Sequence, residues 1–212
     1  MSVDQISNYS SNNMLVQNLM KVRDVTNENE IMGAISTAMD SVSLSFIGKS
    51  FAGYYESLRS EGDQKALEGL RQMAIHLTEN PSNERAIDFS NIMRAREGEE
   101  GFLNTFFSTV HDVADSGNSL GFWFNTFTNL DAASNQDGFL SSTSNILSLE
   151  GDKKETAGIF SEFLRMTDQA IKHFQDEDLR RENLDDFFGS LKERESIEGY
   201  RESIEDFREN MN

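Results

Sequence analysis

The chain has 212 residues, which is enough for one sizeable hydrophobic core or for two small helical lobes. Acidic residues outnumber basic ones 37 to 19, so the formal net charge is −18, and a surface of that sign repels nucleic-acid backbones and anionic lipids. The absence of cysteine excludes disulfides, thiolate metal sites and cysteine nucleophiles.

The first segment, residues 1–13, is rich in Ser and Asn and is predicted to be a flexible leader. It lacks a basic stretch followed by an apolar run, so no Sec-type signal peptide is visible. No stretch approaches the roughly 18 apolar residues that a membrane-spanning helix needs. The sequence therefore predicts a protein without membrane insertion that is cytoplasmic, or is exported without a Sec-type signal peptide.

From Met14 onward, apolar residues recur every three or four positions, which is the spacing of an amphipathic helix. Pro81, the only proline, ends one of these patterns, and residues 115–118 form a turn. Residues 131–138 are polar and turn-like. The apolar stripes cover residues 14–22, 31–58, 67–77, 87–93, 102–113, 120–130, 139–147, 159–174, 179–191 and 197–207.

No segment shows the sustained alternation of a strand, so the sequence predicts an all-α helical bundle of about seven to nine helices. The helices are predicted to form a single domain over residues 14–212, or two packed lobes with a sub-boundary near 116–118. In the most apolar stripe, Trp123 lies between Phe122 and Phe124 and cannot point the same way as both. At least one of these three side chains is therefore predicted to be exposed or to lie in a subunit contact.

The C-terminal stripe contains a short internal repeat, in which residues 195–201 are echoed seven positions later by residues 202–208. Two copies of a heptad are too few for a coiled coil, but they predict a short helix with one apolar docking face. That face packs either on the chain's own core or on a protein partner. Its residues are Ile197, Tyr200, Ile204 and Phe207.

Catalytic patterns are weak. The three histidines, His76, His111 and His173, do not form a zinc-binding pair, and no nucleophile-elbow motif for a catalytic serine occurs. Asp112 and Asp115 follow His111 closely, which on a helix indicates a surface ion pair. The sequence therefore predicts a protein that is not an enzyme, while an enzyme that uses scattered carboxylates stays open as an alternative.

One loop, residues 131–141, resembles a degenerate EF-hand calcium loop. Asn135, Asp137 and Gly138 match two ligands and the turn glycine, and apolar residues flank them. Two extra residues separate Asp131 from Asn135, and Ser144 stands where the bidentate glutamate belongs. The resemblance implies calcium ligands at Asp131, Asn135, Asp137 and the Phe139 carbonyl, and the alternative is a plain polar loop between helices.

These observations favour a non-enzymatic helical protein that acts through protein–protein interaction or assembly. The polar leader, the amphipathic N-terminal helix, the acidic body and the lack of cysteine would suit a structural or accessory protein of a flagellar or type III export system. The alternative function is a calcium-binding module. The predicted partner is a protein or a second copy of the chain, not a nucleic acid, and no cofactor is predicted apart from the calcium of the alternative function.

Overall fold

The computed structural model describes residues 84–96 and 98–211, together with Gln17, Met20, Arg71 and Ile75. The predicted leader at residues 1–13 and the helices predicted before residue 84 lie outside this part of the chain. The described residues form seven helices and no strand, which confirms the predicted all-α helical bundle. The helices are α5 (Glu84–Ala95), α6 (Glu100–Asp115), α7 (Leu120–Thr128), α8 (Ala133–Leu147), α9 (Lys153–His173), α10 (Glu177–Lys192) and α11 (Ile197–Asn210).

The chain forms two compact units, Met1–Phe107 and Ser108–Asn212, and the boundary between them lies within α6. The turn at residues 116–118, near which the sequence suggested a sub-boundary, connects α6 to α7. Gly117 supplies a positive φ of 72° there, a conformation that favours glycine.

The described part of the first unit is a small aromatic cluster. Phe89 on α5 and Phe106 on α6 are fully buried, with ring centroids 5.5 Å apart. Arg96 follows α5 and contacts the start of α6. Its guanidinium carbon lies 4.0 Å from the centroid of the Phe102 ring, and its terminal nitrogen lies 2.6 Å from Glu99 Oε2. A cation over an aromatic face adds a stacking contact to the ion pair.

In the second unit, most helices begin at a side-chain cap that accepts a free backbone N–H. Ser119, Asp152, Asp176 and Ser196 each occupy the N-cap position of α7, α9, α10 and α11 in turn. Such caps each stabilise a helix by about 1 kcal/mol, and they fix where the short connections end. Helix α8 is the exception, because its N-cap, Ala132, has no side chain to accept a bond.

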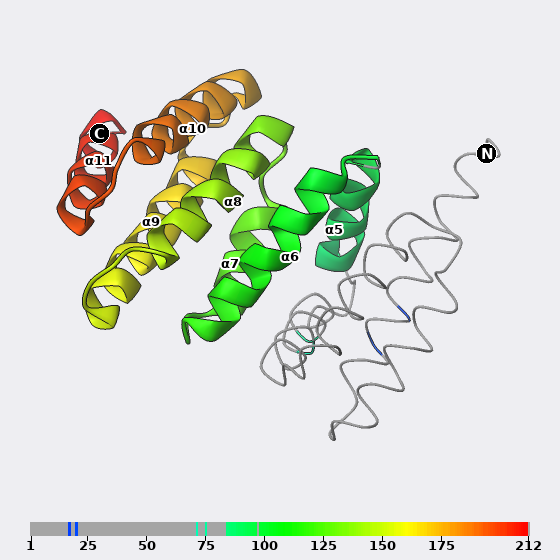
Figure 1. The fold of residues 1–212 in the computed structure, drawn as a ribbon. Coiled ribbons are helices and arrows are strands. Elements are labelled where there is room, and N and C mark those ends of the chain that lie inside the picture. The colour runs from blue at the N-terminus through cyan, green and yellow to red at the C-terminus, as the bar shows by residue number, and fades with distance from the viewer. Residues whose placement is uncertain are drawn as a thin grey trace. The chain divides into compact units, whose positions relative to one another are not determined.

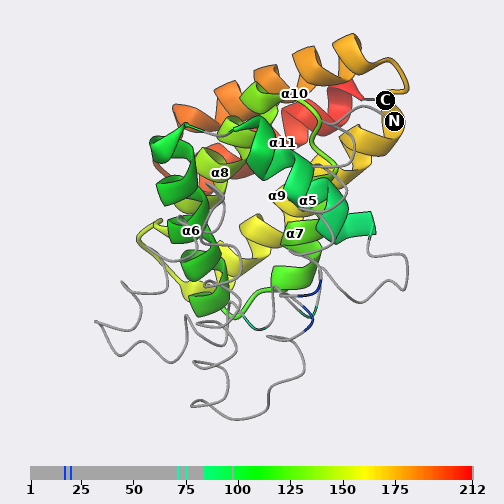
Figure 2. The ribbon, with the colours of Figure 1, turned by 90° about the vertical axis from the view of Figure 1, so that its right-hand side faces the viewer.

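The helices of the second unit pack in two layers, with α8 and α10 in one and α7, α9 and α11 in the other (Figure 1). Figure 2 shows the same helices in a view turned by 90°. Short connections make consecutive helices antiparallel, so each helix also packs on the next but one. The contacts run in parallel register: Asp131, just before α8, and Asn135 of α8 meet Arg180 and Asp185 of α10 in the same order.

Aromatic rings fill the space between the layers. Phe163 of α9 lies at the centre, with its ring centroid 5.4 Å from Phe139 on α8 and 6.1 Å from both Phe187 and Phe188 on α10. Trp123 of α7 is fully buried and stacks on Phe139. Its indole Nε1 donates to Thr143 Oγ1 at 3.0 Å, so the one polar atom of the indole is satisfied in the core.

Three large side chains of the described apolar stripes are exposed: Ile87, Phe122 and Leu179. Phe122 is 36% exposed while Trp123 and Phe124 are fully buried, which confirms that the three cannot share one direction. Leu179, which the stripe over residues 179–191 included, is 47% exposed because it lies in the first turn of α10, outside the packed face.

The prediction of a turn-like segment over residues 131–138 was wrong, because α8 begins at Ala133. Polar side chains favour turns when they bond to their own backbone. Here Ser134 and Asn135 bond to α10 instead, which leaves the local backbone free to form a helix. Gly138 is a helical residue that faces Phe188.

Candidate functional site

A polar seam joins α8 to α10. Asn135 is fully buried, and its Nδ2 donates to Asp185 Oδ1 at 2.7 Å and to the Arg181 carbonyl at 3.1 Å. Ser134 donates to the other oxygen of Asp185 at 3.0 Å. One turn earlier, Arg180 pairs with Asp131. Because a buried amide must be hydrogen-bonded, these contacts fix the register of α8 against α10.

Three of the four predicted calcium ligands lie in surroundings that differ from those of a calcium loop. The Asp131 carboxylate is held by Arg180, Asp137 is exposed on α8, and Phe139 is a buried helical residue whose ring lies in the core. The Asn135 Oδ1 atom is buried and has no hydrogen-bond partner among the described residues. Among residues 84–96 and 98–211, no three His, Asp or Glu side chains converge in a group that could hold a metal ion. Calcium binding therefore stays a prediction.

Calorimetry tests whether the loop binds calcium, as the sequence suggested, or whether the pairing of Asp131 with Arg180 prevents it. A calcium ion at this position would have to displace Arg180 from Asp131 and would find only one free amide oxygen. We expect no saturable heat up to about 1 mM calcium, the weak end of the range for calcium loops. A saturable heat that disappears in Asp131→Asn would contradict this expectation and would establish the loop as a site.

A second polar cluster connects the C-terminal part of α6 to α8. Ser144 Oγ lies 3.1 Å from Thr109 Oγ1 and 3.4 Å from Asp112 Oδ2, and His111 Nδ1 lies 3.9 Å from Asp112 Oδ1. Asp112 lies between the imidazole and the hydroxyl. In a hydrolytic triad the histidine takes the middle position and receives the serine proton, so this order is not that of a triad.

Burial raises the pKa of the Asp112 carboxyl above its ordinary value of 3.8; nearby His111 and the Ser144 hydrogen bond act in the opposite direction, and Asp115 adds to the rise. A raised folded-state pKa means that the charged carboxylate opposes folding at neutral pH, and that this opposition vanishes as the pH falls through the folded pKa toward the ordinary value. We therefore expect Asp112→Asn to raise the melting temperature at pH 7, with a gain that shrinks toward about pH 4.

Thermal unfolding followed by circular dichroism at both pH values measures this difference. Asp186→Asn, on the exposed side of α10, is the matched control. A gain as large at pH 4 as at pH 7 would mean that the substitution acts through packing and not through the charge.

The predicted docking face of α11 lies on the chain's own core, the first of the two alternatives. Tyr200, Ile204 and Phe207 are buried and Ile197 is half-buried. Phe207 stacks flat on Phe187 of α10, with centroids 4.0 Å apart and an interplanar angle of 9°. Binding of another protein by these four residues stays a prediction. Such a partner would have to displace the contacts that this face makes within the chain.

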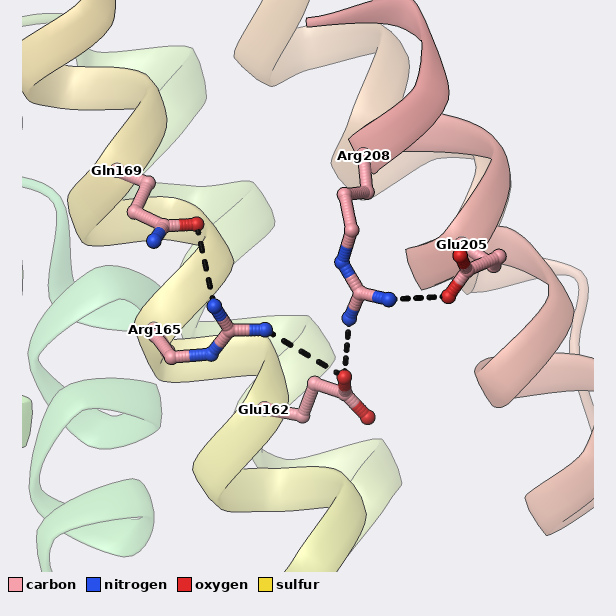
Figure 3. Close-up of polar contacts among 5 residues, drawn as sticks. All are labelled: Glu162, Arg165, Gln169, Glu205 and Arg208. Atoms are coloured by element: carbon pink, nitrogen blue, oxygen red, sulfur yellow. Dashed lines mark hydrogen bonds and ion pairs between the residues drawn. The ribbon is translucent and has the colours of Figure 1, made fainter. Parts of the chain in front are cut away.

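Ion pairs tie α11 to α9. Arg208 reaches Glu162 on α9 and Glu205 on its own helix, and Arg165 lies 3.6 Å from the same Glu162 oxygen (Figure 3). Arg165 also lies 3.5 Å from Gln169. The pairing of Arg208 with Glu205 could be read from helical spacing, but Glu162 lies 46 residues away in sequence and no local pattern indicates it.

The outer surface of the second unit is strongly acidic. Residues 108–212 contain 22 Asp and Glu against 10 Lys and Arg, which accounts for −12 of the net charge of −18. Several exposed carboxylates on and beside α10 and α11 have no ion-pair partner among the described residues: Glu177, Glu182, Asp186, Glu193, Glu195, Glu202, Asp206 and Glu209.

None of the helices in the described part combines the length and the apolar character that crossing a bilayer requires. Comparison of the chain with protein-family models, with curated proteins and with solved structures found no match.

Proposed function

We propose that this chain is a non-enzymatic helical protein that acts by binding another protein through the outer surface of its helix stack. The observation that carries the proposal is the parallel packing of each helix on the next but one, with α8 on α10 and α9 on α11. Stacked helix pairs of this kind expose long continuous surfaces, and many of them bind protein partners there.

The interior polar groups support a binding function over a catalytic one. Asn135 with Asp185, Trp123 with Thr143, and Arg194 with Ser203 each join two neighbouring elements. Side chains that hold helices in register are not available to activate a substrate.

The outer face of α11 is polar, and a polar face associates with other molecules less readily than an apolar one. The exposed side chains of α11 are almost all charged: Glu198, Arg201, Glu202, Glu205, Asp206 and Glu209. We therefore place the binding surface on another side of the stack and not on the outer face of α11.

On α10, an exposed stripe offers both apolar and acidic contacts. Leu179 is 47% exposed, and Glu182, Asp186 and Glu193 follow it at helical spacing on the exposed side. The surface excess of carboxylates is complementary to a partner that carries Lys or Arg around an apolar side chain. Binding through this stripe should weaken as the salt concentration rises.

Site-specific photo-cross-linking in the cells that produce the protein tests the proposal. A photo-reactive phenylalanine analogue replaces Leu179 in one variant, Phe122 in a second and the buried Phe163 in a background control. We expect a discrete adduct with a second protein from the exposed Leu179 position and none from Phe163. An adduct with another copy of the chain would indicate self-assembly, and no discrete adduct from either exposed position would contradict the proposal.

Matched charge reversals show whether the α10 stripe forms the contact. Glu182→Lys, Asp186→Lys and Glu193→Lys together change the charge by as much as Glu195→Lys, Glu202→Lys and Glu209→Lys do near or on α11. The first set should abolish the adduct and the second should leave it. Equal loss from both would mean that only the total charge matters.

The narrower proposal, a structural or accessory role in a flagellar or type III export system, is supported by composition alone. A reporter enzyme fused to residues 1–20 and assayed for secretion by such a system tests it. Retention of the reporter inside the cell would remove this role and would leave the binding proposal intact.

A further inference from the structure

The outer face of α10 is an acidic stripe. Its residues recur at spacings of three and four on the side opposite the buried residues, and each of them is exposed: Leu179, Glu182, Asp186, Gly189 and the C-cap Glu193. The three carboxylates have no ion-pair partner among the described residues, and no cation interrupts the stripe. The stripe therefore presents uncompensated negative charge along the helix.

The outer face of α9 has the opposite character. Helix α9 contains four basic and three acidic residues, whereas none of the helices α7, α8, α10 and α11 contains an excess of basic residues. The exposed stripe opposite its buried residues contains three cations and no acidic residue: Lys154, Gly158, Ser161, Arg165 and Lys172. One chain thus carries both an acidic and a basic helix face.

The cations of the α9 stripe are more exposed than the acidic residues beside them. The side chain of Lys172 is 72% exposed, and that of its ion-pair partner Asp168 is 14% exposed. The side chain of Arg165 is 49% exposed, and that of its partner Glu162 is 33% exposed. Lys154 has no ion-pair partner among residues 84–96 and 98–211. The charge that another molecule meets on this face is therefore positive.

Each stripe also contains a glycine that leaves room for another helix. A Cβ added to Gly158 or to Gly189 would have nothing within 4 Å. Glycine inside a helix lowers its stability relative to alanine, and neither glycine is needed for a contact within the described part of the chain. A missing side chain lets the backbone of a partner helix come close at these two positions.

The charges of the two stripes match in spacing. Lys154 and Arg165 are 11 residues apart, and so are Glu182 and Glu193. In an α-helix this separation is about 16 Å and about three turns, so the two charges of each pair point the same way. When the two helices run antiparallel, Lys154 can lie opposite Glu193. The same register places Arg165 opposite Glu182 and brings the two glycines together.

The two stripes cannot meet within one chain. Helices α9 and α10 pack on each other from different layers, so their outer faces point away from each other (Figure 1). A partner for the α10 stripe must carry cations at matching positions. A second copy of the chain has such a face on α9, with the required spacing and with a glycine at the crossing point.

We propose that the α10 stripe of one copy binds the α9 stripe of a second copy, with the two helices antiparallel. This inference rests on the proposed function, because it names the occupant of the α10 stripe. Leu179 then lies near the aliphatic parts of Arg165 and Lys172, which can cover it while their charges stay in water. Because the contact joins two different faces, each bound copy keeps one free stripe, and further copies add head to tail.

Salt has two opposing effects on this association. The net charge of −18 makes two copies repel each other at long range, and about 0.1 M salt screens charges beyond about 10 Å. The facing charges of the two stripes are closer than that, so about 1 M salt is needed to weaken them. We expect self-association at about 0.1 M salt that decreases several-fold at about 1 M salt.

Light scattering coupled to size exclusion of the purified full-length chain measures the association, between about 10 μM and about 1 mM protein. The mass should rise with concentration from that of one chain. Reversing one face, by Glu182→Lys with Glu193→Lys, should weaken the association at least about tenfold, because two basic faces then meet. Lys154→Glu with Arg165→Glu should have the same effect through two acidic faces.

The chain with all four reversals is the decisive variant. Its net charge equals that of the original chain, and its two stripes are complementary again with the signs exchanged, so self-association should return. A mixture of the two single-face variants should also associate. The control is Glu195→Lys with Glu202→Lys, which changes the net charge as much as the α10 reversal does and lies outside both stripes. Circular dichroism checks that every variant is folded.

Gly189→Gln separates association from stability. Glutamine is a better helix former than glycine, so the melting temperature should rise, while its side chain fills the place where α9 of the second copy comes close. A rise in melting temperature with several-fold weaker association supports the proposal. Association that is unchanged by this substitution would overturn the crossing at the glycines.

Three further results would overturn the proposal. These are a mass of one chain at every concentration in about 0.1 M salt, equal loss of association in the control and in the α10 reversal, and no return of association in the folded chain with four reversals. A purified chain that stays single, together with an adduct between the Leu179 position and a different protein in cells, would remove this inference and leave the proposed function in place.

Discussion

Replacing Phe163 with alanine is expected to lower the free energy of unfolding of the second unit by about 3–5 kcal/mol. The side chain is fully buried, and its ring contacts Phe139 on α8 together with Phe187 and Phe188 on α10. Rings of the facing layer, on α8 and α10, and Phe160 on α9 itself therefore line the cavity that the substitution would leave. The surrounding rings are held by helices on both sides, so they can close the cavity only in part.

Urea unfolding followed by tryptophan fluorescence measures this loss. Trp123 is the only tryptophan, and its ring stacks on Phe139, so its emission reports on the same aromatic core. Phe122→Ala is the matched control, because Phe122 is 36% exposed and its removal leaves no closed cavity. Equal losses from the two substitutions would mean that Phe163 is not central to the packing.

Periodicity alone predicted most of the described helices, although not the first part of α8, because each helix packs a single apolar face. The stripes over residues 102–113, 120–130 and 159–174 coincide closely with α6, α7 and α9. The neighbouring aromatic residues Phe122, Trp123 and Phe124 also behaved as helical geometry requires. Such features depend on residues three or four positions apart, which a local pattern contains.

The local sequence pattern could not predict which side chains of different helices contact each other. Asp185 accepts hydrogen bonds from Ser134 and Asn135 on another helix, and no residue near it in the sequence indicates these contacts. Glu162 and Arg208 lie 46 residues apart, and each of them has closer oppositely charged residues in sequence. Which of many possible charge pairs forms is decided by the packing of the helices, and spacing along one helix does not reveal it.

The segment over residues 131–138 shows how such a contact changes a local interpretation. Its Asp, Asn and Gly residues are typical of a turn, and that composition produced the resemblance to a calcium loop. The partners of Asp131 and Asn135 are on α10, where they were invisible in the sequence. Gly138, interpreted from the sequence as the turn glycine, is needed for a different reason, which leads to the second large effect.

Gly138→Ala is expected to destabilise the second unit by about 1–2 kcal/mol, although alanine is the better helix former. A Cβ at this position would lie 2.8 Å from Phe188 Cδ2 and 2.9 Å from Phe188 Cβ. The Phe188 Cβ is attached directly to the α10 backbone, so a change of rotamer cannot move it away. The two helices must separate, and the buried contacts of Asn135 with α10 would be strained with them.

Two other helical glycines provide the comparison that separates packing from helix propensity. Gly158 on α9 and Gly189 on α10 have nothing within 4 Å of an added Cβ, so alanine there should stabilise the protein by about 0.5–1 kcal/mol. The same substitution is thus expected to have opposite signs at Gly138 and at these two positions in urea unfolding followed by Trp123 fluorescence. Stabilisation at all three would show that α8 and α10 do not approach each other as closely as described, and the register set by Asn135 and Asp185 would then need another explanation.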